Sequence, residues 1–199
     1  MADGTPPAAA APSRARVRPV VLVGLPGAGK SSVGRRLGRR LDRPFVDADD
    51  ELVRRSGRTV RDWFAAEGEA GFRAAEADLM ADLLSAPGPS VVAAGGGAVI
   101  TEATRTLLRE RGRVVWLRAQ VPYLVSRVTQ KVGHRPLLDA DPEGTLSRLR
   151  DERTPLYEEV ADIVVDVEPF RAAHEKPKRE LAIRIARLVL AAEAEDDGR

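Results

Sequence analysis

A glycine-rich segment at Gly24–Ser31 has the residue types and the spacing that bind nucleoside phosphates. It matches the pattern G-x-x-x-x-G-K-S, directly after the apolar run 19–23 and directly before a helical pattern. Glycines allow consecutive backbone N–H groups to converge on phosphate oxygens, and the following helix adds its positive dipole end. We expect Lys30, exposed at the loop, to contact the β- and γ-phosphates and the Ser31 hydroxyl to ligate Mg²⁺. This phosphate loop therefore predicts a site for a nucleoside triphosphate with Mg²⁺.

Other interpretations of the phosphate loop fit the sequence less well. A dinucleotide fingerprint beginning at Gly27 and Gly29 needs a third glycine where Ser32 stands. A glycine-rich turn with an incidental lysine leaves the hydroxyl and the strand–helix context unexplained. The chain contains no Asn, which excludes the guanine-selective N-K-x-D motif and the catalytic loop of protein kinases. A kinase that phosphorylates a small molecule remains.

Two carboxylates, Asp47 and Asp49, follow a second short apolar run. The carboxyl ends of parallel strands face the ligand crevice, so both side chains should lie near the phosphate loop. We expect Asp47 to hold Mg²⁺ through water and Asp49 to accept a proton from an acceptor hydroxyl group. The structural alternative is that Asp49 or Asp50 caps the helix that follows.

A polar segment at about 131–141 predicts a mobile lid. It contains Gly133 and Pro136 and lies between two helical patterns. Phosphoryl transfer must exclude water, and Arg135 in this segment can reach the transferring group as an arginine finger. Without the phosphate loop, an ordinary charged loop would be the better interpretation.

Short apolar runs alternate with helical patterns along the chain. We predict strands at 19–23, 44–47, 90–93, 113–117 and 163–165, and helices at 31–41, 49–55, 59–66, 68–84, 101–110, 121–128, 142–157 and 178–191. This alternation predicts an α/β fold, with a parallel sheet between layers of helices.

Composition limits the classes of function. The chain has no Cys and only two His, which excludes a disulfide scaffold and metal sites with several thiolate or imidazole ligands. Its 32 basic residues, of which four are Lys, are spread among 30 acidic residues, and aromatic residues make up 4%. Nucleic-acid binders show a dense basic block with interleaved aromatic residues. We therefore predict no nucleic-acid partner.

We expect one domain at residues 17–191 between two tails. Residues 1–16 are rich in Pro and Ala and lack the apolar core of a signal peptide, and four of the eight residues at 192–199 are acidic. We interpret the first as a disordered tail and the second as a frayed end. No stretch reaches the ~18 apolar residues of a membrane span. The expectation is a cytoplasmic, monomeric enzyme without a membrane partner.

Taken together, these motifs resemble those of the shikimate kinase family from Arg18 to about Asp166. The matching segments are Gly24–Ser31, Phe45–Asp49, Gly71–Arg73 with Glu76, Gly95–Ala98, Arg135–Leu138 and Arg153–Tyr157. The phosphate loop alone is common to a large superfamily, but the order of all segments is specific. The resemblance implies a three-layer P-loop kinase with a five-stranded parallel sheet, a lid and a helical substrate-binding region. It also implies ATP-dependent phosphorylation of the shikimate 3-hydroxyl group, in the chorismate route to aromatic amino acids.

The resemblance also assigns roles to individual residues. Asp49 holds the acceptor hydroxyls, while Arg73 and Arg153 clamp the shikimate carboxylate, since a planar guanidinium binds a carboxylate bidentately. The run Gly95, Gly96 and Gly97 lets substrate lie against bare backbone. Glu76 stands three positions after Arg73 and is expected to orient the Arg73 guanidinium. The expected ATP-binding residues are Gly27, Ala28, Gly29, Lys30, Ser31, Ser32, Arg127, Arg135 and Arg171, and the expected catalytic residues are Lys30, Asp49 and Arg135.

The sequence departs from the family pattern after Asp166. A longer and differently composed segment stands where the family has a short loop whose Arg and Pro flank the adenine. Arg171 in this segment and Arg127 before the lid are our candidates for the adenine contacts.

Two other functions compete with this interpretation. A gluconate-like kinase of the same superfamily would show another acceptor, and ADP release that depends on shikimate separates the two. A P-loop ATPase or nucleic-acid-linked protein would turn over ATP without a small acceptor, or would bind DNA with a steep salt dependence.

Overall fold

The computed structural model describes residues 17–129, 141–168 and 177–198. Its centre is a sheet with the strand order β2-β3-β1-β4-β5, in which all neighbouring strands are parallel. The strands are β1 (Val20–Val23), β2 (Phe45–Asp47), β3 (Val91–Ala93), β4 (Arg113–Arg118) and β5 (Ile163–Asp166). The predicted five-stranded parallel sheet is confirmed.

The middle strand, β1, is buried along its whole length. Each of its four side chains is at most 1% exposed, as expected for a continuous β-branched run in a sheet covered on both faces. Val21 pairs with Val92 of β3 and with Val114 of β4. This register brings the segments that follow β1 and β3, the phosphate loop and residues 95–97, to the same edge of the sheet.

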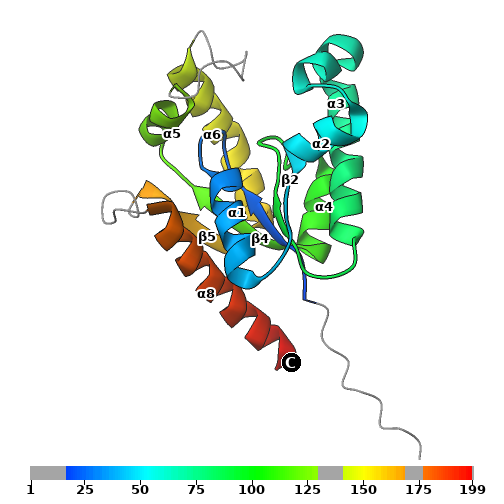
Figure 1. Ribbon diagram of the computed structural model, residues 1–199. Coiled ribbons are helices and arrows are strands. Elements are labelled where there is room, and N and C mark those ends of the chain that lie inside the picture. The colour runs from blue at the N-terminus through cyan, green and yellow to red at the C-terminus, as the bar shows by residue number, and fades with distance from the viewer. Residues whose placement is uncertain (1–16, 130–140, 169–176, 199) are drawn as a thin grey trace, which may run out of the picture.

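Helices cover both faces of the sheet (Figure 1). Helices α1 (Lys30–Leu41) and α8 (Pro177–Asp197) pack along each other, whereas α4 (Glu102–Arg111) contacts both α3 (Val60–Ser85) and α6 (Pro142–Val160). The other helices are α2 (Ala48–Ser56), which packs on α3, and α5 (Val121–Val128), which packs on α6. The layers are those of the predicted three-layer α/β fold.

Helix α3 is interrupted at Gly68, whose φ of 68° and ψ of −172° lie outside the helical range. A Cβ at this position would meet no atom within 4 Å, so the backbone conformation and not space requires glycine here. The sequence predicts two helices that meet at this residue. A capping box between Thr59 and Asp62 begins the first of them.

The C-terminal boundary differs from the prediction. Helix α8 does not end at residue 191 but continues to Asp197, so the acidic residues expected in a frayed tail are helical. Glu193 accepts two hydrogen bonds of 2.8 Å from Arg43, and Asp196 pairs with both Arg18 and Arg113. These ion pairs hold the last turns of the helix against the domain.

Some predictions lie outside the described residues. They are the N-terminal tail at 1–16, the lid at 131–141 except for Asp141, and the ATP-binding candidates Arg135 and Arg171. Asp141 is the N-cap of α6, where its carboxylate accepts a hydrogen bond of 2.9 Å from Gly144 N. Among the helices of the described ranges, none has the length and apolarity needed to cross a membrane.

Candidate active site

The phosphate loop joins β1 to α1 through backbone conformations that favour glycine. Gly24, Gly27 and Gly29 have φ values of 141°, 90° and 97°. A Cβ at Gly24 would also lie 2.7 Å from the Leu117 carbonyl oxygen of β4. Helix α1 begins at Lys30, and its N-cap, Gly29, offers no side chain to the first turn. The N-terminal donors of the helix therefore have the arrangement that binds an anion.

The Lys30 side chain lies inside the loop and not on the surface as predicted. The residue is 9% exposed, and its ammonium group donates to the carbonyl oxygens of Gly24 at 2.7 Å and Leu25 at 3.3 Å. The expectation of an exposed lysine was wrong because the loop curls around the side chain. The charge is nevertheless held at the place where the loop would surround phosphates.

Helix α5 brings Arg127 to the phosphate loop. A Cβ at Gly27 would lie 3.1 Å from the Leu124 carbonyl oxygen and 3.5 Å from Arg127 Cβ. Ala28 is 1% exposed, and its N–H donates to the Leu25 carbonyl oxygen at 3.2 Å. The predicted nucleotide-binding residues that come together here are Gly27, Ala28, Gly29, Lys30, Ser31, Ser32 and Arg127.

The two predicted carboxylates at the end of β2 have different surroundings. Asp47 is the N-cap of α2, since its Oδ1 accepts a hydrogen bond of 3.2 Å from Asp49 N. The structural alternative, a cap at Asp49 or Asp50, is thereby corrected. Asp49 lies in the first turn of α2, and a Cβ at Gly95 would be only 2.9 Å from its Oδ1. The Asp49 carboxylate thus faces residues 95–97.

Residues 95–97 form a turn after β3 that has no side chains, which we call the glycine turn. A Cβ at Gly95 would overlap Oε1 of Glu76, and a Cβ at Gly97 would lie 2.6 Å from Nη2 of Arg73. Helix α3 therefore lays a carboxylate and a guanidinium directly on this backbone. Only glycine allows both to approach so closely.

A buried carboxylate, Glu76, holds Arg73 in place. Arg73 Nη1 donates to Glu76 Oε2 at 2.7 Å, which confirms the pair predicted from their spacing. Glu76 is 5% exposed, and its burial raises its pKa above the ordinary value. The nearby Asp49 carboxylate also raises this pKa, whereas Arg73 and Arg153 oppose the rise.

Helix α6 contributes Arg153 and Tyr157 from the opposite side of the glycine turn. Arg153 Nη1 and the Tyr157 hydroxyl donate to the same acceptor, the Gly96 carbonyl oxygen, at 2.8 and 2.9 Å. Tyr157 also stacks on Trp116 with 5.6 Å between ring centroids, and burial raises its pKa to about 12. No role for Tyr157 was predicted from the sequence, although its spacing of four from Arg153 places both on one helix face.

The site thus joins the phosphate loop to the glycine turn, against which two carboxylates and two arginine side chains lie. The structure brings together the predicted substrate-binding residues Asp49, Arg73, Gly95, Gly96, Gly97 and Arg153.

Comparison with known proteins shows the family to which the chain is related. A family model described as "Shikimate kinase" matches residues 26–187. A shikimate kinase of Bordetella avium is 50% identical over 149 residues, covering 74% of this chain and 70% of that protein. One of Rhodopseudomonas palustris is 44% identical over 174 residues, covering 83% of this chain and 84% of that protein.

Solved structures agree with the sequence relatives. The shikimate kinase of Acinetobacter baumannii in complex with shikimate has a TM-score of 0.78 and 37% identity, over 89% of this chain and 96% of that one. The shikimate kinase of Aquifex aeolicus has a TM-score of 0.71 and 31% identity, over 88% and 97%. With a family match over most of its length and relatives this similar, the chain belongs to the shikimate kinase family.

Proposed function

We propose that this chain transfers the γ-phosphoryl group of ATP to the 3-hydroxyl group of shikimate, a step on the chorismate route to aromatic amino acids. The observation that carries the proposal is the meeting of Arg73 and Arg153, from different helices, at the glycine turn beside Asp49. Two planar guanidinium groups select a substrate with a carboxylate. A carboxylate such as Asp49 binds hydroxyl groups, so the pair of features fits a hydroxylated acid. Family membership supports this substrate.

Asp49 is the proposed base for the acceptor hydroxyl group. It stands in the first turn of α2 and is not needed as the helix cap, which Asp47 supplies. Its carboxylate lies against Gly95 and can accept a hydrogen bond from a hydroxyl group bound over the glycine turn. Proton transfer from that hydroxyl to Asp49 would accompany attack on the γ-phosphoryl group.

Arg73 and Arg153 are the proposed clamp for the substrate carboxylate. Each guanidinium has five N–H donors, and the contacts with Glu76, Glu69 and the Gly96 carbonyl use only some of them. The Nε atoms of both residues are buried, so we assign the remaining Nη donors to substrate. Because Glu76 and Gly96 fix the two planes beforehand, less side-chain entropy is lost on binding.

Lys30 is the proposed stabiliser of the transferring charge. Its ammonium group rests on two carbonyl oxygens of the phosphate loop, and ATP phosphates would replace these weaker acceptors. Charge on the β- and γ-phosphate oxygens would then face both the ammonium group and the N-terminus of α1.

The oxygen donors of Ser31 and Asp47 fit the needs of Mg²⁺. Mg²⁺ prefers oxygen ligands, keeps several waters and is held by one or two protein groups together with nucleotide phosphates. Ser31 follows Lys30 in the first turn of α1, and Asp47 ends β2 at the same edge of the sheet. When bound, the ion would neutralise phosphate charge.

Three further roles are proposed. By the resemblance to the family, we assign Arg135 to the transferring phosphoryl group, as part of a lid at 131–141. Arg127 and Arg171 are our candidates for the adenine contacts, and Arg171 stands where the chain departs from the family pattern. A Cβ at Gly27 of the phosphate loop would lie 3.5 Å from Arg127 Cβ, which supports the assignment of Arg127.

Formation of ADP with and without shikimate tests the proposed function. ADP should form only when shikimate is present, and phosphorus NMR should show one new phosphate ester. The variant Arg153→Lys keeps the charge but loses the planar fork, so the KM for shikimate should rise by about 10- to 150-fold, which corresponds to ~1.5–3 kcal/mol. The KM for ATP is the internal control.

Two outcomes would contradict the proposal. ADP formation at the same rate without shikimate would mean an ATPase, and phosphorylation of gluconate in preference to shikimate would mean another acceptor. If Arg153→Lys changed only the KM for ATP, Arg153 would belong to the nucleotide site.

A further inference from the structure

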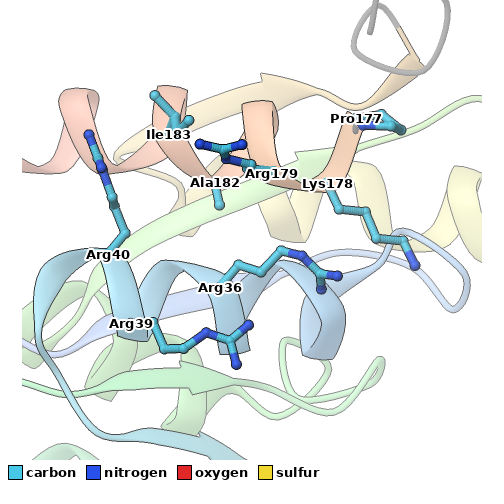
Figure 2. A pocket seen from close by; sticks show the side chains of 8 residues that line it. All are labelled: Arg36, Arg39, Arg40, Pro177, Lys178, Arg179, Ala182 and Ile183. Atoms are coloured by element: carbon cyan, nitrogen blue, oxygen red, sulfur yellow. The ribbon is translucent and has the colours of Figure 1, made fainter. Parts of the chain in front are cut away.

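A basic groove of about 580 Å³ lies between α1 and α8 (Figure 2). Among the described residues that line it, five are cationic, none is acidic and none is aromatic. The lining residues are Arg36, Arg39, Arg40, Lys178 and Arg179, together with Pro177, Ala182 and Ile183. This volume is within the range of small-molecule sites.

The groove begins next to the proposed ATP-binding residue Ser32, whose carbonyl oxygen accepts a hydrogen bond of 2.8 Å from Arg36, and extends away from the phosphate loop. Arg39 and Arg40 follow Lys30 by nine and ten positions, about 14 Å along the helix axis. Their partners across the groove come from α8 (Figure 2), which supplies no residue that we place in the transfer of the phosphoryl group.

Three arginines of α1 lie close enough along the helix to repel one another. Arg36, Arg39 and Arg40 have the spacing i, i+3 and i+4, so they share one face of the helix, and like charges at this spacing destabilise a helix. All three are exposed. Within the described ranges, neither these three nor Arg179 takes part in an ion pair.

The charged residues of α8 differ between its two ends. Near its C-terminus, Glu193 forms an ion pair with Arg43, and Asp196 forms ion pairs with Arg18 and Arg113. In its first turn it instead adds further cations to the groove, although the dipole of a helix disfavours positive charge at its N-terminus. The acidic residue of that turn, Glu180, does not line the groove.

We infer that this groove is a binding site for a small polyanion, a compact molecule with several phosphate groups. Guanidinium groups on both walls can each bind a phosphate bidentately, and a bound anion would remove the repulsion within α1 and at the start of α8. A small ligand fits better than nucleic acid, because the described cations of the groove are confined to residues 36–40 and 178–179, and its described lining offers no aromatic surface on which bases stack.

Calorimetric titration with inositol hexakisphosphate tests this site. The titration is run on the full chain with saturating ADP and no added metal, so that the nucleotide occupies the phosphate loop. We expect one equivalent to bind. A groove variant, Arg39→Gln with Arg40→Gln and Arg179→Gln, should bind at least tenfold more weakly.

The matched control is Arg35→Gln with Arg184→Gln and Arg187→Gln. It removes the same charge from the same two helices, at exposed residues that do not line the groove, and should bind within threefold of the parent chain. Both variants should keep the shikimate-dependent activity, and the groove variant should melt no lower than the parent chain because it loses like charges on α1. If the groove variant does not fold, Arg40→Gln and Arg35→Gln make the same comparison singly.

Three outcomes would overturn the inference. Equal weakening in both variants would mean general attraction to a basic surface, and loss of binding when ADP is added would mean that the anion occupies the phosphate loop. Tighter binding of a 20-base-pair DNA duplex that depends on the same arginines would mean a nucleic-acid site.

Discussion

The Lys30 side chain is held by backbone carbonyl groups of the phosphate loop. Its contacts with the carbonyl oxygens of Gly24 and Leu25 keep a nearly buried ammonium group satisfied before phosphates arrive. The residue therefore contributes to the stability of the loop as well as to the proposed stabilisation of charge on the transferring phosphoryl group.

The variant Lys30→Ala should accordingly lose activity and some stability. Removing this cation should lower kcat by roughly 10²- to 10³-fold, as for other groups that stabilise transition-state charge. Leaving two buried acceptors with weaker partners should cost about 1–2 kcal/mol, which lowers the melting temperature by about 2–4 °C per kcal/mol. Steady-state kinetics and calorimetry measure both. The exposed Arg61→Ala is the control, and turnover that matched the parent chain at saturating ATP would contradict the assignment of the phosphate loop.

Glu76 should make stability depend on pH in an unusual direction for a carboxylate. Its pKa is raised in the folded chain, so folding favours the protonated form. The stability that Glu76 contributes is full below its unfolded pKa, near 4.5, and is lost as pH rises through the raised folded value. Each unit of pKa difference corresponds to about 1.4 kcal/mol.

Replacing Glu76 by Gln removes this titration and isolates it. The free energy of unfolding of the parent chain, minus that of Glu76→Gln, should fall as pH rises from 4.5. Urea unfolding at several pH values measures the difference, in which the carboxylates that do not interact with Glu76 cancel. A difference that grew with pH would mean that the ion pair with Arg73 outweighs burial.

At the scale of elements, the glycine turn after β3 determines how closely α2, α3 and α6 approach the substrate. The three glycines are not equivalent. A Cβ at Gly97 would meet the end of the flexible Arg73 side chain, whereas a Cβ at Gly96 would be 3.4 Å from Pro26 and 3.9 Å from Arg153, which is close to ordinary contact.

We expect Gly97→Ala to displace the Arg73 guanidinium without unfolding the turn. The KM for shikimate should rise about tenfold or more, as expected when a charged contact is weakened, while the melting temperature changes little. Kinetics with shikimate and with ATP distinguish this effect from a general loss of activity. An unchanged KM for shikimate would show that Arg73 does not clamp the substrate.

The elements themselves were largely predictable, because their signals are local. Alternating apolar runs and helical patterns gave all five strands, and Gly68 marked the break in α3. The close packing around the glycine turn was harder to predict from the sequence. The shared acceptor of Arg153 and Tyr157 is Gly96, which precedes them by 57 and 61 positions, and no local pattern encodes such a contact. Nor did the loop sequence reveal that its own backbone encloses Lys30.

At the scale of the whole molecule, ion pairs join the C-terminal turns of α8 to the rest of the domain. Their composition, rich in acid, predicted a frayed end because the arginines that neutralise it lie far away in the sequence. Arg43 is 150 positions from Glu193, and Arg113 is 83 positions from Asp196. The Arg43 and Glu193 side chains are only 8% and 16% exposed, so the pair is shielded from solvent.

This shielding predicts a strong coupling between Arg43 and Glu193. In a double-mutant cycle with Arg43→Ala and Glu193→Ala, the interaction should contribute about 1–3 kcal/mol to the free energy of unfolding. The exposed pair Arg148–Glu152, with side chains 63% and 51% exposed, is the control and should give about 0.5 kcal/mol or less. Activity should persist in every variant, since neither pair lies in the proposed site. Equal coupling in the two pairs would mean that Glu193 holds α8 no more strongly than an ordinary surface charge.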